Sequence, residues 1–151
     1  TTGLWISKAI AVDASGTMWA GGFDGLLKYN GSAWTLYDNV AFFGFTSNTL
    51  FYDILPDGNI LWIATSKGLL KFDKSTTTVL ANYNSLNSPL QDNCVVRIAK
   101  DAGGNLWLAV SACPVGLWPG NAAGREGRGV QSGPVHQSSV RPPALLDAHA
   151  L

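Results

Sequence analysis

The sequence predicts an all-β protein made of β-propeller blades, each a four-stranded antiparallel sheet. A tryptophan recurs as Trp19, Trp62 and Trp107, at intervals of 43 and 45 residues. In the first two copies the motif Gly-Leu-Leu-Lys-aromatic begins six residues after the tryptophan, at 25–29 and 68–72. Apolar stripes with the 3.6-residue period of a helical solenoid are not visible. A repeat of this length is typical of one propeller blade.

Each repeat can be divided into four strands. The alternating segment 96–99 is typical of a first strand, and the Asp-x-x-Gly turn after it supplies a glycine that tolerates positive φ. In the second strand, as at 105–109, the tryptophan is expected to fill the gap between neighbouring sheets. Third strands are predicted at 25–29 and 68–72, and outer strands at 33–37 and 77–83. The predicted blades cover 8–45, 49–88 and, in part, 92–120.

Two local departures from the repeat lead to further expectations. Gly58 precedes its tryptophan by four residues where the other copies have three, which predicts a bulged hairpin. The third copy carries three extra residues around Cys113. Cys94 and Cys113 match neither a disulfide framework nor a zinc-ligand spacing, so we expect two free thiols.

Composition excludes several classes of function. Lysine plus arginine equals aspartate plus glutamate, and 13% of residues are charged, so no basic surface for nucleic acid or an anionic membrane is expected. Apolar runs are too short to span a bilayer. The opening residues, 1–5, lack the basic start and apolar stretch of a signal peptide. We expect a soluble chain without a signal peptide.

The composition changes after about Gly120. Residues 121–151 contain no Phe, Tyr, Trp, Ile or Lys, and Gly, Ala, Pro and Arg are frequent. Two interpretations are open for this tail. It is either foreign sequence from a frameshift or cloning junction, or a native disordered or extended segment.

The blade motif carries a family resemblance. Asp-x-x-Gly-Asn-Leu-Trp-Leu-Ala, followed by Gly-Leu-x-Lys-Phe-Asp, resembles the two-component regulator propeller repeat over about residues 8–118. The resemblance implies an extracytoplasmic (periplasmic), non-catalytic sensor propeller, often part of a hybrid histidine kinase that responds to carbohydrates. The shared residues form strands, turns and packing, so no functional residue of the family is carried over.

A propeller of about three blades is incomplete. Its two end faces would expose apolar surface and unpaired strand edges, which promote aggregation. Copies that complete one another's ring would remove both problems, so we expect a homodimer or homotrimer. A small molecule or carbohydrate is the expected ligand; nucleic acid and membrane are not expected partners.

Candidate ligand-binding residues fall into two groups. Four aromatic side chains could stack on a sugar or another flat ligand, or pack within the blades: Trp34, Tyr37, Phe51 and Tyr52. Three aspartates are not explained by the repeat and are candidate polar contacts: Asp24, Asp53 and Asp92. The repeat-equivalent Asp13, Asp57 and Asp101 are expected to stabilise their hairpin turns.

A second class of function stays open. The alternative is a metal-assisted hydrolase of the esterase or phosphotriesterase type, with its site at the centre of the assembled ring and a divalent ion such as zinc or calcium activating water. Its candidate metal ligands are His136 and His149, both in the tail. No nucleophile-elbow or phosphate-loop pattern supports another reaction. A chelator would abolish turnover by the hydrolase, whereas a binding module has no turnover to lose.

Overall fold

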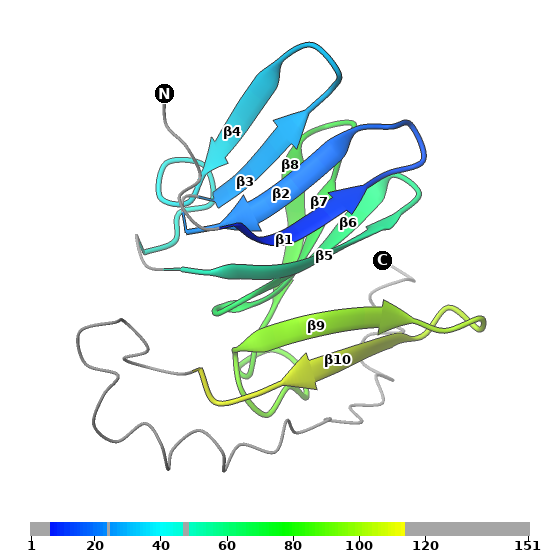
Figure 1. The fold of residues 1–151 in the computed structure, drawn as a ribbon. Coiled ribbons are helices and arrows are strands. Elements are labelled where there is room, and N and C mark those ends of the chain that lie inside the picture. Colours follow the sequence, from blue (N-terminus) through cyan, green and yellow to red (C-terminus); the bar gives the residue numbers. More distant parts are fainter. Residues whose placement is uncertain (1–6, 24, 47–48, 114–151) are drawn as a thin grey trace.

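The computed structural model describes residues 7–23, 25–46 and 49–113, and all regular structure within these ranges is β-strand (Figure 1). The first sheet has the order β1 (Ser7–Val12), β2 (Met18–Gly22), β3 (Gly25–Tyr29), β4 (Trp34–Asp38). The second has the order β5 (Phe51–Asp57), β6 (Ile60–Thr65), β7 (Gly68–Asp73), β8 (Thr78–Tyr83). The third pairs β9 (Val95–Lys100) with β10 (Leu106–Val110).

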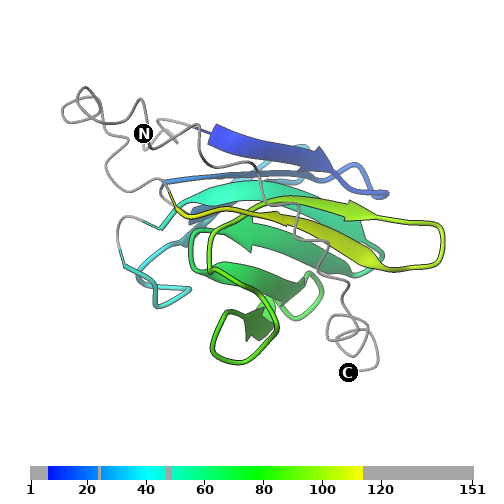
Figure 2. The ribbon, with the colours of Figure 1, turned by 90° about the horizontal axis from the view of Figure 1, so that it is seen from below.

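The three antiparallel sheets are stacked as propeller blades, and they form an open series rather than a closed ring (Figure 1). Seen from below, the third sheet lies over the second (Figure 2). The strands agree with those predicted in the first two repeats. The described part of the chain contains no helix that could cross a bilayer. The later part of the third repeat and the tail lie outside the described residues, so their interpretation stays a prediction.

The hairpin turns confirm one expectation and correct another. Gly16 and Gly104 have φ of 85° and 89°, the left-handed conformation expected of a turn glycine. The predicted bulge at Gly58 is wrong. Asp57 pairs directly with Ile60, so a tight two-residue turn closes this hairpin, and β6 starts earlier relative to its tryptophan.

The core fills the spaces between the sheets. Trp19 and Trp62 are each 1% exposed, as expected for the residue between neighbouring blades. The Trp19 ring meets Phe72 of the second sheet edge-on, at 6.1 Å between centroids. One cluster joins the first and second sheets and another joins the second and third. The blades therefore share their apolar cores rather than folding around separate ones.

Aspartates at the turns stabilise their own hairpins and also connect blades. Asp13 accepts hydrogen bonds from the Trp19 indole at 3.0 Å and, across the blade junction, from Lys74 Nζ at 2.8 Å. Asp57 Oδ1 accepts a hydrogen bond from Lys100 Nζ of the next blade at 2.6 Å. Burial alone would raise the pKa of Asp13, but the hydrogen bonds from Lys74, Ser15, Trp19 and Thr17 outweigh it and hold the pKa well below its usual range.

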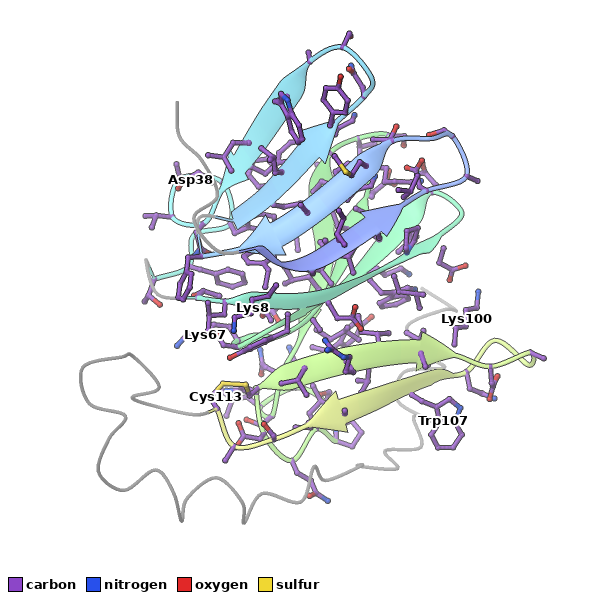
Figure 3. All side chains as sticks on the ribbon, in the orientation of Figure 1. Lys8, Asp38, Lys67, Lys100, Trp107 and Cys113 are labelled. Carbon is purple, nitrogen blue, oxygen red and sulfur yellow. A yellow bond between two sulfur atoms is a disulfide. The ribbon has the colours of Figure 1, made fainter. Side chains whose placement is uncertain are left out.

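The cysteines form a disulfide, so the expectation of two free thiols is wrong. Cys94 precedes β9 and Cys113 follows β10, and their Cα atoms lie 5.1 Å apart. The physical reason is the register: Val95 pairs with Val110 at this end of the hairpin, which brings the two flanking segments together. Figure 3 shows the bond beside the Cys113 label.

Candidate binding groove at the inner strands

The first strand of each sheet has an irregularity near its start. Register shifts separate Ser7 from Ala9 in β1 and Phe51 from Asp53 in β5, and the β9–β10 pairing shifts in the same place. The extra residue in each case is Lys8, Tyr52 or Val96. These positions are 44 residues apart, so the same β-bulge recurs in every blade. Bulges redirect a side chain and are common beside functional sites.

The three bulge residues line one groove. β1 contacts β5 and β5 contacts β9, so the three inner strands are neighbours in space (Figure 1). The groove has a volume of about 340 Å³, and we call it the bulge groove. Its lining consists of Lys8, Tyr52, Val96, Arg97 and Ala109. Each blade therefore contributes an inner-strand residue to a single concave site.

The charges in the bulge groove are positive. Lys8 and Arg97 are both exposed, and the lining that the described residues form contains no carboxylate. Arg97 Nη1 donates to the Tyr52 carbonyl oxygen at 3.4 Å and to the Val96 carbonyl oxygen at 3.2 Å. These hydrogen bonds position the guanidinium at the groove. Burial raises the pKa of the Tyr52 phenol, so this side chain stays neutral beside the two cations.

The nearest candidate acid, Asp53, has a structural role. Its Oδ2 accepts a hydrogen bond from the Ile98 backbone N–H at 2.8 Å, and its Oδ1 accepts one from Ile54 at 3.0 Å. The carboxylate thus connects the second and third blades. The second candidate, Asp92, accepts from the Cys94 N–H at 3.2 Å, just before β9. Asp24 lies outside the described residues.

The four candidate aromatic residues are not brought together. Tyr52 lines the bulge groove, whereas Tyr37 and Phe51 lie in the core between the first two sheets, the packing role considered as their alternative. Trp34 lies on the outer strand β4, 56% exposed, and pairs with the ring of Tyr29 at 4.4 Å between centroids. Tyr52 is therefore the aromatic candidate that the groove can use.

The metal ligands proposed for a hydrolase, His136 and His149, lie outside the described residues. Within the ranges that are described, no group of three or more His, Cys, Asp or Glu side chains could hold a metal ion. The hydrolase alternative and its divalent ion stay predictions.

Sequence reasoning missed Lys8, Val96 and Arg97. A signal was present, because Lys8, Tyr52 and Val96 occupy the same repeat position. Their differing chemistry hid that equivalence: a cation, a phenol and an aliphatic side chain do not form a visible motif.

Comparison with known proteins places the fold. Neither a protein-family model nor a curated protein matches the chain. The extracellular domains of the hybrid two-component systems BT4673 and BT3049 from B. thetaiotaomicron superpose with TM-scores of 0.59 and 0.57, each at 23% identity. They cover 69% and 67% of this chain. PorZ, a surface component of the type-IX secretion system of Porphyromonas gingivalis, has a TM-score of 0.54 at 23% identity and covers 68%.

The sheets of this chain are propeller blades. The structural likeness confirms, at the level of the fold, the resemblance to regulator-type propeller repeats that the sequence motif indicated. The chain spans 14 to 16% of the length of these three proteins.

Proposed function

We propose that this chain is a ligand-binding part of a sensor-type β-propeller, and that the bulge groove is its site for a small anionic ligand. The observation that carries the proposal is the convergence of three repeat-equivalent bulge residues on one groove with two cationic side chains. Packing and turn formation do not require a cation at Lys8 or Arg97. A binding role gives a reason for both charges and for their position.

The chemistry of the groove suits a carboxylate or phosphate on a compact molecule. Arg97 can form two parallel hydrogen bonds to either group, and Lys8 adds a second positive charge. The Tyr52 hydroxyl is a neutral donor, and its ring offers a flat apolar surface. A volume of about 340 Å³ fits a ligand of the size of one sugar acid or one phosphate ester.

Assembly and location form part of the same proposal. Because the described sheets form an open series, further blades are needed to close a ring, and we propose that other copies of this chain provide them. An extracytoplasmic location is supported by the Cys94–Cys113 disulfide, since such bonds persist in oxidising compartments. The extracellular origin of the superposed two-component domains agrees with it.

Titration by calorimetry tests the groove with three named probes. Galacturonate and galactose differ by a carboxylate, and inorganic phosphate carries charge without a sugar ring. We expect galacturonate and phosphate to bind and galactose to bind at least tenfold more weakly. Arg97→Gln and Lys8→Gln should each weaken anion binding at least threefold, while Lys67→Gln, which changes an exposed lysine outside the groove, should not. The proposal would be contradicted if galactose bound as tightly as galacturonate, or if Arg97→Gln bound the anions as tightly as wild type.

A further inference from the structure

Repeat-equivalent residues differ sharply in exposure at the two ends of the stack. Ile54 and Ile98 are 5% and 9% exposed, whereas Ile10, their equivalent in the first blade, is 68% exposed. At the other end, Trp107 is 43% exposed, whereas Trp19 and Trp62 are each 1% exposed. Sequence position within the blade is the same in each set, and among the described residues no further blade packs on Ile10 or Trp107, which accounts for the difference.

The strand register defines the exposed face of the first blade, which we call the head face. Residues paired directly across antiparallel strands share a face. Two such rows cross the sheet from β1 to β4, and every member is apolar or aromatic: Ile10, Ala20, Leu27 and Leu36, then Val12, Met18, Tyr29 and Trp34. Exposed apolar surfaces of this kind commonly mark sites of protein–protein contact.

The opposite end carries the tail face, on the third blade. Its described part includes Trp107 and its register partner Ala99, whereas the next pair, Ala109 and Arg97, lines the bulge groove. Figure 3 shows Trp107 projecting from β10 on the side away from the second sheet. The Trp107 indole donates to Asp101 Oδ2 at 2.9 Å, the same contact that Trp19 makes with Asp13. The tryptophan is thus held in its blade geometry with one face uncovered.

The two junctions within the chain show how neighbouring blades pack on each other. At the first junction, Ile54, Leu61 and Leu70 of the second blade pack on the Trp19 side of the first. At the second junction, Ile98 and Leu106 of the third blade pack on the Trp62 side of the second. In both cases the isoleucine face of one blade meets the tryptophan face of the blade before it.

We infer that the head face of one copy docks on the tail face of a second copy, so that Ile10 joins Trp107 in one apolar cluster as Ile54 joins Trp19. This inference rests on the self-assembly within the proposed function and specifies which surfaces meet. The contact is head-to-tail, because the two faces differ and the internal junctions always join unlike faces. Repeating one such contact closes a ring when the rotation permits it.

The proposed junction between copies lacks the lysine–aspartate ion pairs of the two internal junctions. Lys74 and Lys100 bind the turn aspartates Asp13 and Asp57 across the internal junctions. The repeat positions of these lysines in the first blade are occupied by Gly31 and Val12, so Asp101 receives no such lysine from the head face of a second copy. Assembly should therefore persist in about 1 M salt, which screens exposed charges.

Light scattering of the full chain with one charge placed on each face tests the inference. Wild type should have the mass of two or more chains, and Ile10→Glu and Trp107→Glu should each be monomeric. Mixing the two variants should restore a one-to-one dimer, because each keeps the face that the other has lost. Leu86→Glu, at a residue that is 94% exposed and outside both faces, is the matched control and should assemble like wild type.

The outcomes separate the inference from the proposed function. A monomeric wild type would overturn both the self-assembly and this contact, whereas an oligomer that survives Trp107→Glu would overturn the head-to-tail contact alone. A mixture that stays monomeric would also overturn it. Val12→Glu and Ala99→Glu repeat the test on each face if either first variant fails to fold, as judged by circular dichroism. Titration of the bulge groove with anions tests the proposed binding function independently of the contact between copies.

Discussion

Replacing Lys74 by methionine tests whether the ion pairs between blades stabilise the stack according to their burial. Methionine keeps most of the aliphatic stem and removes the charge. Lys74 and Asp13 have side chains 16% and 3% exposed. The matched control is Lys100→Met, which removes the corresponding contact to Asp57, where the two side chains are 33% and 25% exposed.

The expected costs differ because the carboxylates differ in exposure. Removing one partner of a buried pair leaves an uncompensated charge and typically costs 3–5 kcal/mol. Asp13 keeps its hydrogen bonds from Ser15, Thr17 and Trp19, so we expect the lower end, about 3 kcal/mol, for Lys74→Met. For the exposed pair we expect about 0–1 kcal/mol.

Urea unfolding followed by tryptophan fluorescence measures both values, at one protein concentration because assembly affects apparent stability. The pKa of Asp13 is lowered in the folded state, so its contribution is present above the unfolded value of about 3.9 and is lost as the pH falls toward the folded value. The gap between wild type and Lys74→Met should therefore narrow below about pH 4. Equal costs at Lys74 and Lys100, or a gap that does not change with pH, would refute this account.

Three further predictions concern the framework. An added Cβ at Gly25, where φ is +127°, would overlap the Tyr37 carbonyl oxygen, so Gly25→Ala should cost at least about 2 kcal/mol in urea unfolding. Gly31→Ala, at φ +100° in open space, should cost about 1 kcal/mol; a reversed order would contradict the geometry. Replacing both Cys94 and Cys113 by alanine opens a cross-link with a sequence separation of 19 and should remove about 3 kcal/mol, seen as a lower Tm that no longer responds to reductant. Phe51→Ala, in the core, should cost about 3–5 kcal/mol against less than about 0.5 for Leu86→Ala, and similar losses would place Phe51 outside the core.

The strands could be predicted because the same residues recur at the strand boundaries of consecutive repeats. Trp19 and Trp62 with the motifs after them fix the second and third strands, and the glycines fix the turns. Positions of the same residue type in consecutive copies left little freedom for another fold. The core role of the first two tryptophans followed from the same pattern.

The connections between blades could not be predicted in the same way. Lys74 reaches Asp13 across 61 residues of sequence, and nothing local to either residue signals the contact. The disulfide was missed because two cysteines 19 residues apart form no motif, and the hairpin register decides whether they meet.

The bulges were partly anticipated and wrongly placed. The one-residue offset around Gly58 indicated a bulge at the hairpin, but the structure has a two-residue turn there. The true bulges lie at the starts of the inner strands, as at Tyr52. The alternation of apolar and polar residues there does not show that one residue is extra. The candidate site was therefore found through Tyr52 alone, and its cations, Lys8 and Arg97, emerged from the register.

Anomalous diffraction from crystals soaked in selenate would show whether the bulge groove binds an anion, because it locates a bound oxyanion without assuming a ligand. We expect a selenium peak in the bulge groove, within hydrogen-bonding distance of Arg97 and beside Lys8 and Tyr52. Peaks at other surface lysines, such as Lys67, with none in the groove would contradict it.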